Sequence, residues 1–163
     1  MLACMSKSAS PIPAGFHSVN VHLYVEGAAE YIDFLARAFG GVEISRSPAP
    51  SGKLMHAQVR IGDSMLMFSD DFSAEFGLPP LAKGRMPFLM HLYVPDVDAA
   101  WERVVAAGCE VTMPLSDQFW GDRYGHVRDP FGVLWALATR TEDLTPAEIQ
   151  ERQAKAFAAG HPS

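Results

Sequence analysis

The sequence His-Leu-Tyr-Val occurs twice in this chain, at residues 22–25 and again at 91–94, an offset of 69. Later landmarks repeat at almost the same spacing, since His56 and Gly62 correspond to His126 and Gly132. A period near seventy residues is too long for a solenoid repeat, and two copies do not make an array. The sequence therefore predicts one supersecondary unit that is built twice.

Each copy begins with a strand followed by an amphipathic helix. Polar and apolar residues roughly alternate in the first strand, which is typical of a strand with one buried face. The helix of each copy ends at glycine, at Gly40 and at Gly108, where a left-handed residue costs little. We expect the two strands at 16–25 and 88–94, and the two helices at 27–39 and 96–107.

Three more strands complete each copy. They are expected at 42–47, 54–61 and 65–69 in the first copy, and at 109–113, 119–128 and 133–139 in the second. Gly62-Asp63 and the Asp-Pro-Phe-Gly sequence at 129–132 suit tight turns between the last two strands. The predicted fold class is α+β, with two βαβββ modules forming curved mixed sheets. Because a helix covers one face of each sheet, we expect a ligand on the open face.

The predicted organisation places a module on each side of a linker rich in proline. The expected boundaries are a flexible N-terminal tail at 1–15, a first module at 16–77, a linker at 78–87, a second module at 88–140, and a C-terminal helix and tail at 141–163. The sequence Thr-Pro-Ala-Glu at 145–148 is typical of a helix start, because Thr caps, Pro occupies the first turn and Glu reaches back.

Composition narrows the classes of partner. The net charge is −6 and no lysine or arginine cluster interrupts it, which argues against nucleic acid binding. No apolar run is long enough to span a bilayer, and the start of the chain lacks the pattern of a signal peptide. The two cysteines, Cys4 and Cys109, have no metal or redox spacing. We therefore expect a cytoplasmic protein without membrane partners.

Two stretches in the second copy are informative beyond periodicity: Asp-Gln-Phe-Trp-Gly-Asp-Arg-Tyr-Gly at 117–125 and Arg-Asp-Pro-Phe-Gly at 128–132. Together with the doubled βαβββ pattern they resemble the glyoxalase/bleomycin resistance/dioxygenase superfamily, also called vicinal oxygen chelate, and within it the PhnB-like proteins. The resemblance covers residues 16–139. It implies a small-molecule ligand and a homodimer. The activity stays open, because this fold hosts lyases, dioxygenases, epimerases, thiol transferases and non-catalytic drug binders.

Metal-using relatives carry ligands on the first and fourth strands of each copy. The resemblance places those positions here at Asn20, Leu89, about Leu66, and Ala136. Leucine and alanine have no lone pair for a divalent cation, and one asparagine is a weak ligand. We therefore expect no metal and no other cofactor. This departure argues against reactions that need the metal as a Lewis acid.

His22 and His91 are the leading candidate site residues, and also the only catalytic candidates. They stand two residues beyond the expected first-strand ligand positions, and strand alternation therefore puts them on the open face. They would line a pocket, act as an acid/base pair, bind a divalent metal at a displaced site, or simply satisfy a structural hydrogen bond. His56 and His126 also repeat, but the pattern does not decide which way they face.

The remaining candidates lie in the glycine-flanked stretch of the second copy. Trp120 and Arg123 would clamp a planar or anionic ligand, with Asp117 adding a polar contact. The alternative is an exposed hairpin with a local ion pair of little value. Three functions thus remain: a binder of a small organic molecule in a metal-free cup with histidine acid/base chemistry at most, a lyase/isomerase or dioxygenase with a displaced metal, or a purely structural protein.

Overall fold

A computed structural model describes residues 11–77, 79 and 88–158. The expected N-terminal tail up to residue 10, nearly all of the expected linker at 78–87, and the end of the chain from 159 lie outside the described residues. The chain divides into two compact units. One unit holds residues up to 36 and from 40 to 81, and the other holds residues 37–39 and those from 82 onward.

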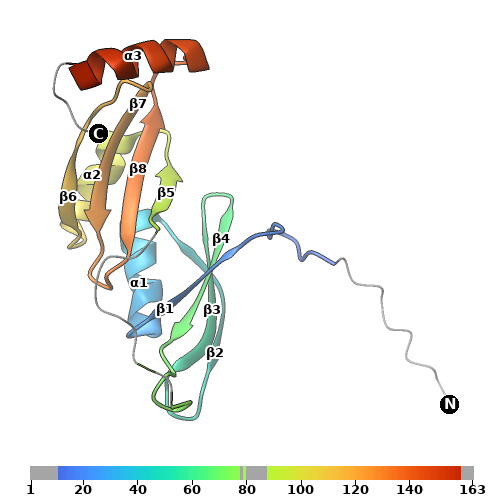
Figure 1. Cartoon of the computed structure of the whole chain (residues 1–163). Helices are drawn as coiled ribbons and strands as arrows, with labels where there is room; N and C mark the ends of the chain where they lie inside the picture. Colours follow the sequence, from blue (N-terminus) through green and yellow to red (C-terminus); the bar gives the residue numbers. More distant parts are fainter. Residues whose placement is uncertain (1–10, 78, 80–87, 159–163) are drawn as a thin grey trace. The chain divides into compact units, whose positions relative to one another are not determined.

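The first unit contains four strands and a helix (Figure 1). They are β1 (Val21–Val25), α1 (Ala28–Phe39), β2 (Val42–Pro48), β3 (Leu54–Ile61) and β4 (Ser64–Asp70). The strand order is β1-β4-β3-β2, with β1 parallel to β4 and the other pairs antiparallel. The parallel pair is possible because α1 carries the chain across the sheet.

The second unit repeats this arrangement and adds a helix. Its elements are β5 (Met90–Tyr93), α2 (Val97–Ala106), β6 (Glu110–Asp117), β7 (Asp122–Arg128), β8 (Leu134–Arg140) and α3 (Pro146–Ala158). The strand order is β5-β8-β7-β6, again with one parallel pair, β5 and β8. These two mixed sheets confirm the predicted α+β fold of two βαβββ modules with a C-terminal helix.

Each helix covers the aliphatic face of its own sheet. In the first unit Tyr31 and Phe34 of α1 are buried, and the Tyr31 ring meets Phe68 of β4 edge-on at 5.1 Å. Leu23 and Phe68 are cross-strand partners on that face. In the second unit α2 lies on one side of the sheet and buries Val97, Ala100 and Val104, as Figure 1 shows. Burying this apolar area stabilises the unit by roughly 25 cal/mol per Å².

Several expected boundaries are wrong by a few residues. The first strand begins at Val21 and not at residue 16, because Asn20 bonds back to the His17 main chain and closes a local turn. The strand expected at 119–128 begins at Asp122, since Gly121 N donates to the Gln118 carbonyl in a turn with positive φ. Alternation does not reveal either turn, because both are closed by hydrogen bonds that leave the polar and apolar pattern unchanged.

Candidate functional site

The face of the first sheet opposite α1 carries two histidines. His22 and Tyr24 of β1 point to it, and the strand register brings His56 of β3 to the same side. The His22 and His56 rings lie 5.7 Å apart between centroids. His22 Nε2 is 3.4 Å from Ser69 Oγ, and Gln58 Nε2 is 3.1 Å from His56 Nε2. Polar side chains therefore line this face.

The corresponding face of the second sheet is more aromatic. His91 lies between two tyrosines, with ring centroids 4.6 Å from Tyr93 and 5.5 Å from Tyr124. The Tyr124 hydroxyl is 2.6 Å from His126 Nε2. His91 and Tyr93 are exposed, whereas Tyr124 and His126 are half-buried. The rings form one continuous cluster on the face that α2 leaves uncovered.

A buried carboxylate anchors this cluster. Asp122 is only 5% exposed, and its Oδ2 accepts hydrogen bonds from the Tyr93 hydroxyl at 2.9 Å and from Trp120 Nε1 at 3.1 Å. Trp120 comes from the turn before β7, and its ring packs edge-on against Tyr124 at 5.3 Å. Asp122 therefore orients two aromatic side chains from separate elements.

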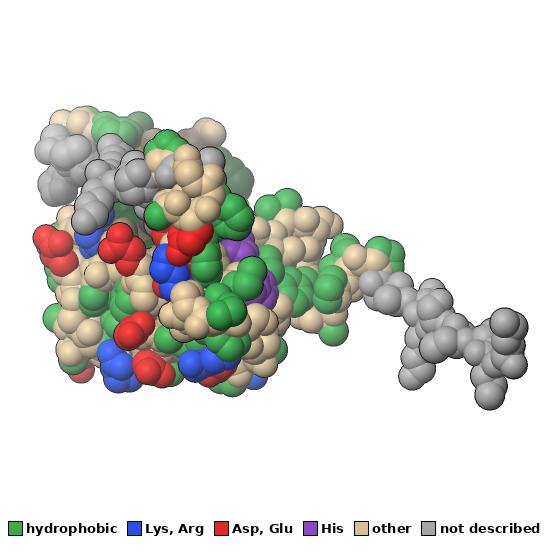
Figure 2. Space-filling view, turned by 90° about the horizontal axis from the view of Figure 1, so that it is seen from below, with side chains coloured by type: hydrophobic (Ala, Val, Ile, Leu, Met, Phe, Trp, Pro, Cys, Tyr) green, Lys and Arg blue, Asp and Glu red, His purple; other side chains and the backbone are tan. Residues whose placement is uncertain are grey.

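Each unit thus places an equivalent pair of histidines on the face of its own sheet that is opposite its helix. His56 and His126, whose direction the sequence leaves undecided, both face the side of His22 and His91. Figure 2 shows histidine side chains at the surface of the molecule with hydrophobic side chains beside them. The structure therefore brings four histidines to open faces, two on each sheet.

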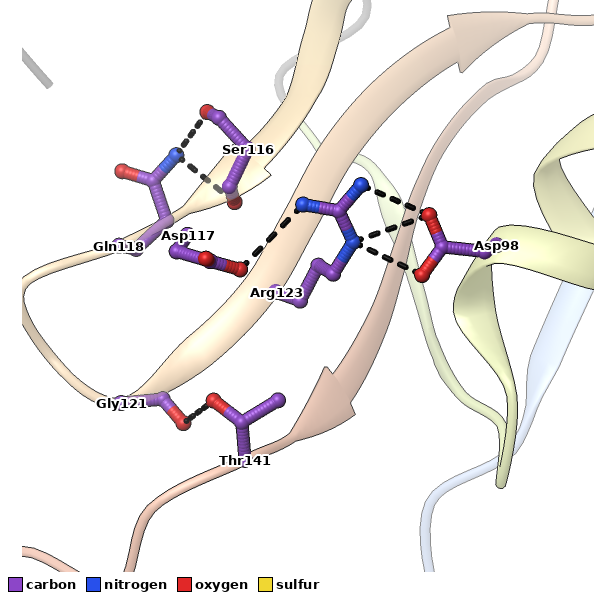
Figure 3. Close-up of polar contacts among 7 residues, drawn as sticks. All are labelled: Asp98, Ser116, Asp117, Gln118, Gly121, Arg123 and Thr141. Atoms are coloured by element: carbon purple, nitrogen blue, oxygen red, sulfur yellow. Dashed lines mark hydrogen bonds and ion pairs between the residues drawn. The ribbon is translucent and has the colours of Figure 1, made fainter.

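Arg123 and Asp117 lie on the other side of their sheet. Arg123 neighbours Tyr124 in β7 and so points the opposite way, toward α2. Its guanidinium donates three hydrogen bonds to Asp98 of α2, at 2.7, 2.8 and 3.0 Å, and one to Asp117 at 3.3 Å (Figure 3). The bond from Arg123 lowers the pKa of the Asp98 carboxyl. The structure therefore separates this pair from Trp120 and from the histidines.

Burial and repulsion between imidazoles lower the pKa of one histidine on each open face. Desolvation, followed by repulsion from His56, lowers the pKa of His22. Desolvation, followed by repulsion from His91, lowers the pKa of His126. The hydrogen bond to Asp122 raises the pKa of Tyr93. At neutral pH the imidazoles of His22 and His126 are therefore neutral and both donate and accept hydrogen bonds.

The family's metal positions do not fit a metal in this chain. The side chain of Asn20 is bonded to the His17 main chain, and neither Leu89 nor Ala136 carries a donor atom. On the fourth strand of the first unit, near the expected position, Leu66 pairs with Val21 and is buried, and its neighbour Met67 pairs with His22; neither side chain carries a nitrogen or oxygen donor. Within the described ranges no three His, Cys, Asp or Glu side chains cluster as metal ligands.

Among the described helices, none combines the length and the apolar character that a bilayer crossing requires.

Comparison with known proteins gives a consistent picture. Residues 15–137 match the model of the Glyoxalase/Bleomycin resistance protein/Dioxygenase superfamily. An uncharacterized protein of Mycobacterium tuberculosis is 43% identical over 136 residues, which cover 82% of this chain and 80% of that protein. The crystal structure of TioX from Micromonospora sp. ML1 is 29% identical, with a TM-score of 0.59 over 77% of this chain and 99% of that one. A PhnB protein from Bacillus cereus, 18% identical with a TM-score of 0.62, covers 76% of this chain and 99% of that one and shares the fold.

Proposed function

This chain belongs to the Glyoxalase/Bleomycin resistance protein/Dioxygenase superfamily, and from that premise we propose that it binds a small organic molecule with a planar aromatic group, without a bound metal. The binding surface is the open face of the second sheet. His91 and Trp120 contact the ligand there, and Tyr93 and Tyr124 extend the surface. His22 and His56 supply hydrogen-bonding groups on the open face of the first sheet.

The observation that carries this proposal is the ring cluster held by Asp122. An isolated exposed aromatic side chain is common, but here four rings from two strands and a turn meet on a face that no described helix covers. Aromatic pairs prefer offset and edge-on contacts, so a planar ligand extends the cluster at little conformational cost. Binding sites for small molecules combine such apolar walls with a few fixed polar groups.

Any turnover at this face would rest on proton transfer. His91 and His126 are the available acid/base groups, and His126 is already hydrogen-bonded to Tyr124. Positioned acid/base catalysis contributes about 10²–10⁴-fold. We therefore propose that a lyase or isomerase reaction at this face would need only the transfer of a proton between the substrate and these histidines.

The test is a thermal-shift screen of planar aromatic compounds against the full chain. A ligand at a hundred times its Kd stabilises the folded state by about 2.7 kcal/mol and raises Tm by several degrees. Trp120→Leu and His91→Ala should abolish the shift. Phe157→Leu, at an exposed aromatic residue of α3, is the matched control and should retain it. The proposal fails if Trp120→Leu binds the hits as well as the parent does.

A displaced metal site is the second candidate, favoured by the 5.7 Å separation of the His22 and His56 rings. Two imidazoles supply half of the ligands that a tetrahedral zinc requires. Elemental analysis of natively purified protein decides the matter. Stoichiometric zinc, nickel, manganese or iron that disappears in both His22→Ala and His56→Ala would replace our proposal with a metal-dependent lyase/isomerase or dioxygenase.

We further propose that the protein is a cytoplasmic homodimer. Cys109 is buried, and desolvation raises the pKa of its thiol to about 12, so it persists as an inert thiol in a reducing compartment. Light scattering coupled to size exclusion would give about twice the mass of the 17.8 kDa chain. A monomeric mass at micromolar concentration would contradict the dimer.

A further inference from the structure

We infer that the ligand of the second open face is an organic cation, a planar aromatic or alkylated ammonium ion. This inference rests on the proposed function and specifies its ligand class. It concerns the aromatic face, which we define as His91, Tyr93, Trp120 and Tyr124. A neutral planar ligand would satisfy the proposed function, but three observations favour a positive charge.

The first observation is that the polar tips of three of these rings, Tyr93, Trp120 and Tyr124, are already occupied. The Tyr93 hydroxyl and Trp120 Nε1 both donate to Asp122, and the Tyr124 hydroxyl is engaged with His126. What remains for a ligand is the ring faces. The face of an aromatic ring is negative and its edge is positive, so such faces attract cations, with tryptophan the strongest.

The second observation is the charge behind the rings. Asp122 is 5% exposed, and the two side chains that donate to it in the described part of the chain, Tyr93 and Trp120, are neutral. A carboxylate that accepts hydrogen bonds from a phenol and an indole pushes electron density toward their rings. It also places a negative charge next to the ligand, where low exposure limits screening.

The other charges on this face leave that negative charge in place. Arg140 stands opposite Asp122 in the register, but its guanidinium is paired with Asp143. At the far end of β7, Arg128 stands opposite Glu110 of β6. Arg140 is ion-paired and Arg128 faces an acidic residue of opposite charge, so Asp122 sets the sign of the charge beside the rings. The neutral imidazole of His126 adds no repulsion, because burial lowers its pKa.

The third observation is that the first unit lacks this arrangement. Tyr24 corresponds to Tyr93 in the repeat and is equally exposed, at 61% against 60%. The residue opposite Tyr24 on β4 is Ser69. In this part of the repeat, where His56 corresponds to His126, the offset is 70, so the position that corresponds to Asp122 is Gly52, which has no side chain. The carboxylate is therefore a feature of the second unit alone.

The experiment compares two molecules of the same shape that differ in charge. N-methylquinolinium and 1-methylnaphthalene are offered to the full chain by equilibrium dialysis at pH 7.5 and low salt. The cation should bind at least about tenfold more tightly, the ratio that one desolvated cation–π contact supports. Asp122→Asn should reduce this ratio toward one, provided that its circular dichroism is unchanged.

Two exposed tyrosines give a matched pair of variants that does not depend on the buried aspartate. Tyr93→Leu removes a ring of the aromatic face and should weaken binding of N-methylquinolinium several-fold. Tyr24→Leu removes an equally exposed ring from the first unit and should leave it unchanged. Equal losses in the two variants would overturn the inference.

The outcomes separate this inference from the proposed function. Equal affinity for the two molecules overturns the cation inference, while the planar-ligand proposal stands. No binding of N-methylquinolinium also overturns it, and the proposed function is then judged by its own screen with neutral compounds. If both Asp122→Asn and Tyr93→Leu still prefer the cation, the cation binds somewhere other than the aromatic face, and the assignment of the ligand to that face is overturned.

Discussion

The buried carboxylates among the described residues differ in whether main-chain groups donate to them. Asp70 and Asp129 accept main-chain N–H groups, so they hold turns and strand ends in place. Asp122 instead accepts from two side chains, Tyr93 and Trp120, that reach an open face. A buried charge is costly unless it is fully bonded. The first two repay this cost by fixing the main chain, whereas Asp122 orients rings that a ligand would touch.

Asp129→Asn should destabilise the fold by about 1–3 kcal/mol. Asp129 Oδ1 accepts from the amides of Phe131 and Val133, and Oδ2 accepts from Trp135 Nε1. An asparagine that keeps the first two bonds turns its NH₂ group toward the Trp135 donor. Urea unfolding would measure the loss. Asp63→Asn, at an exposed turn, is the control and should change stability by less than about 0.5 kcal/mol.

Stability should fall as the pH drops below about 6.5, the ordinary value for histidine. The folded-state pKa values of His22 and His126 are lowered, so the unfolded chain binds more protons in the window between the folded and unfolded values. The urea midpoint should therefore decrease from pH 7.5 to 5.5. His126→Gln should flatten this slope, and His17→Gln, in the exposed segment before β1, should not. A slope unchanged in His126→Gln would contradict the assignment.

At the scale of elements, strand register decides which side chains share a face. Tyr124 and Arg123 are neighbours in β7, yet one joins the aromatic cluster and the other bonds to α2. Shifts in pairing at β2 and β6 add to this, because each shift changes which residues stand opposite one another. Neighbouring residues of β7 therefore contribute to two different faces of the sheet, the open face and the face that packs against α2.

Gly125→Ala should cost about 1–3 kcal/mol through overpacking between β7 and α2. A Cβ at this position would lie 2.7 Å from Cη2 and Cζ3 of Trp101. The variant Trp101→Leu makes room, so the double variant should be destabilised by less than the sum of the two single changes. Chemical unfolding of all four proteins gives the coupling. If the two stability changes were strictly additive, the Trp101 indole would not be what limits the size of the residue at position 125.

At the scale of the whole molecule, the chain is a duplicated module whose copies have diverged in chemistry. Both copies keep the strand order and a pair of histidines on the open face. One copy surrounds them with Ser69 and Gln58, and the other with aromatic rings above a carboxylate. Duplication therefore supplies the scaffold twice, and substitution on the open faces makes the two faces different.

Removal of residues 146–163 should leave both sheets folded. No residue of α3 is buried, and its described polar tie to the body is the exposed pair Arg152–Glu142, which is worth at most about 1 kcal/mol. Urea unfolding of the truncated chain should show a loss of about that size, most of it reproduced by Arg152→Ala. A much larger loss would mean that α3 covers an interface, for instance between copies of the chain.

The sequence by itself determined the doubled βαβββ architecture, since the tetrapeptide repeat, the alternation in the strands and the glycines after the helices are local signals. It also placed His22 and His91 on the open faces, by alternation counted from the ligand positions that the family resemblance implies. The direction of His56, His126 and Arg123 was decided only by the tertiary structure. Their facing depends on bulges and on turns such as the one at Gly121, which are fixed by hydrogen bonds between strands distant in sequence. Asp122 also joins Trp120, two residues before it, to Tyr93, which lies 29 residues before it. Only strand pairing in the sheet brings Tyr93 within reach of Asp122, so the tertiary structure decides this contact as well.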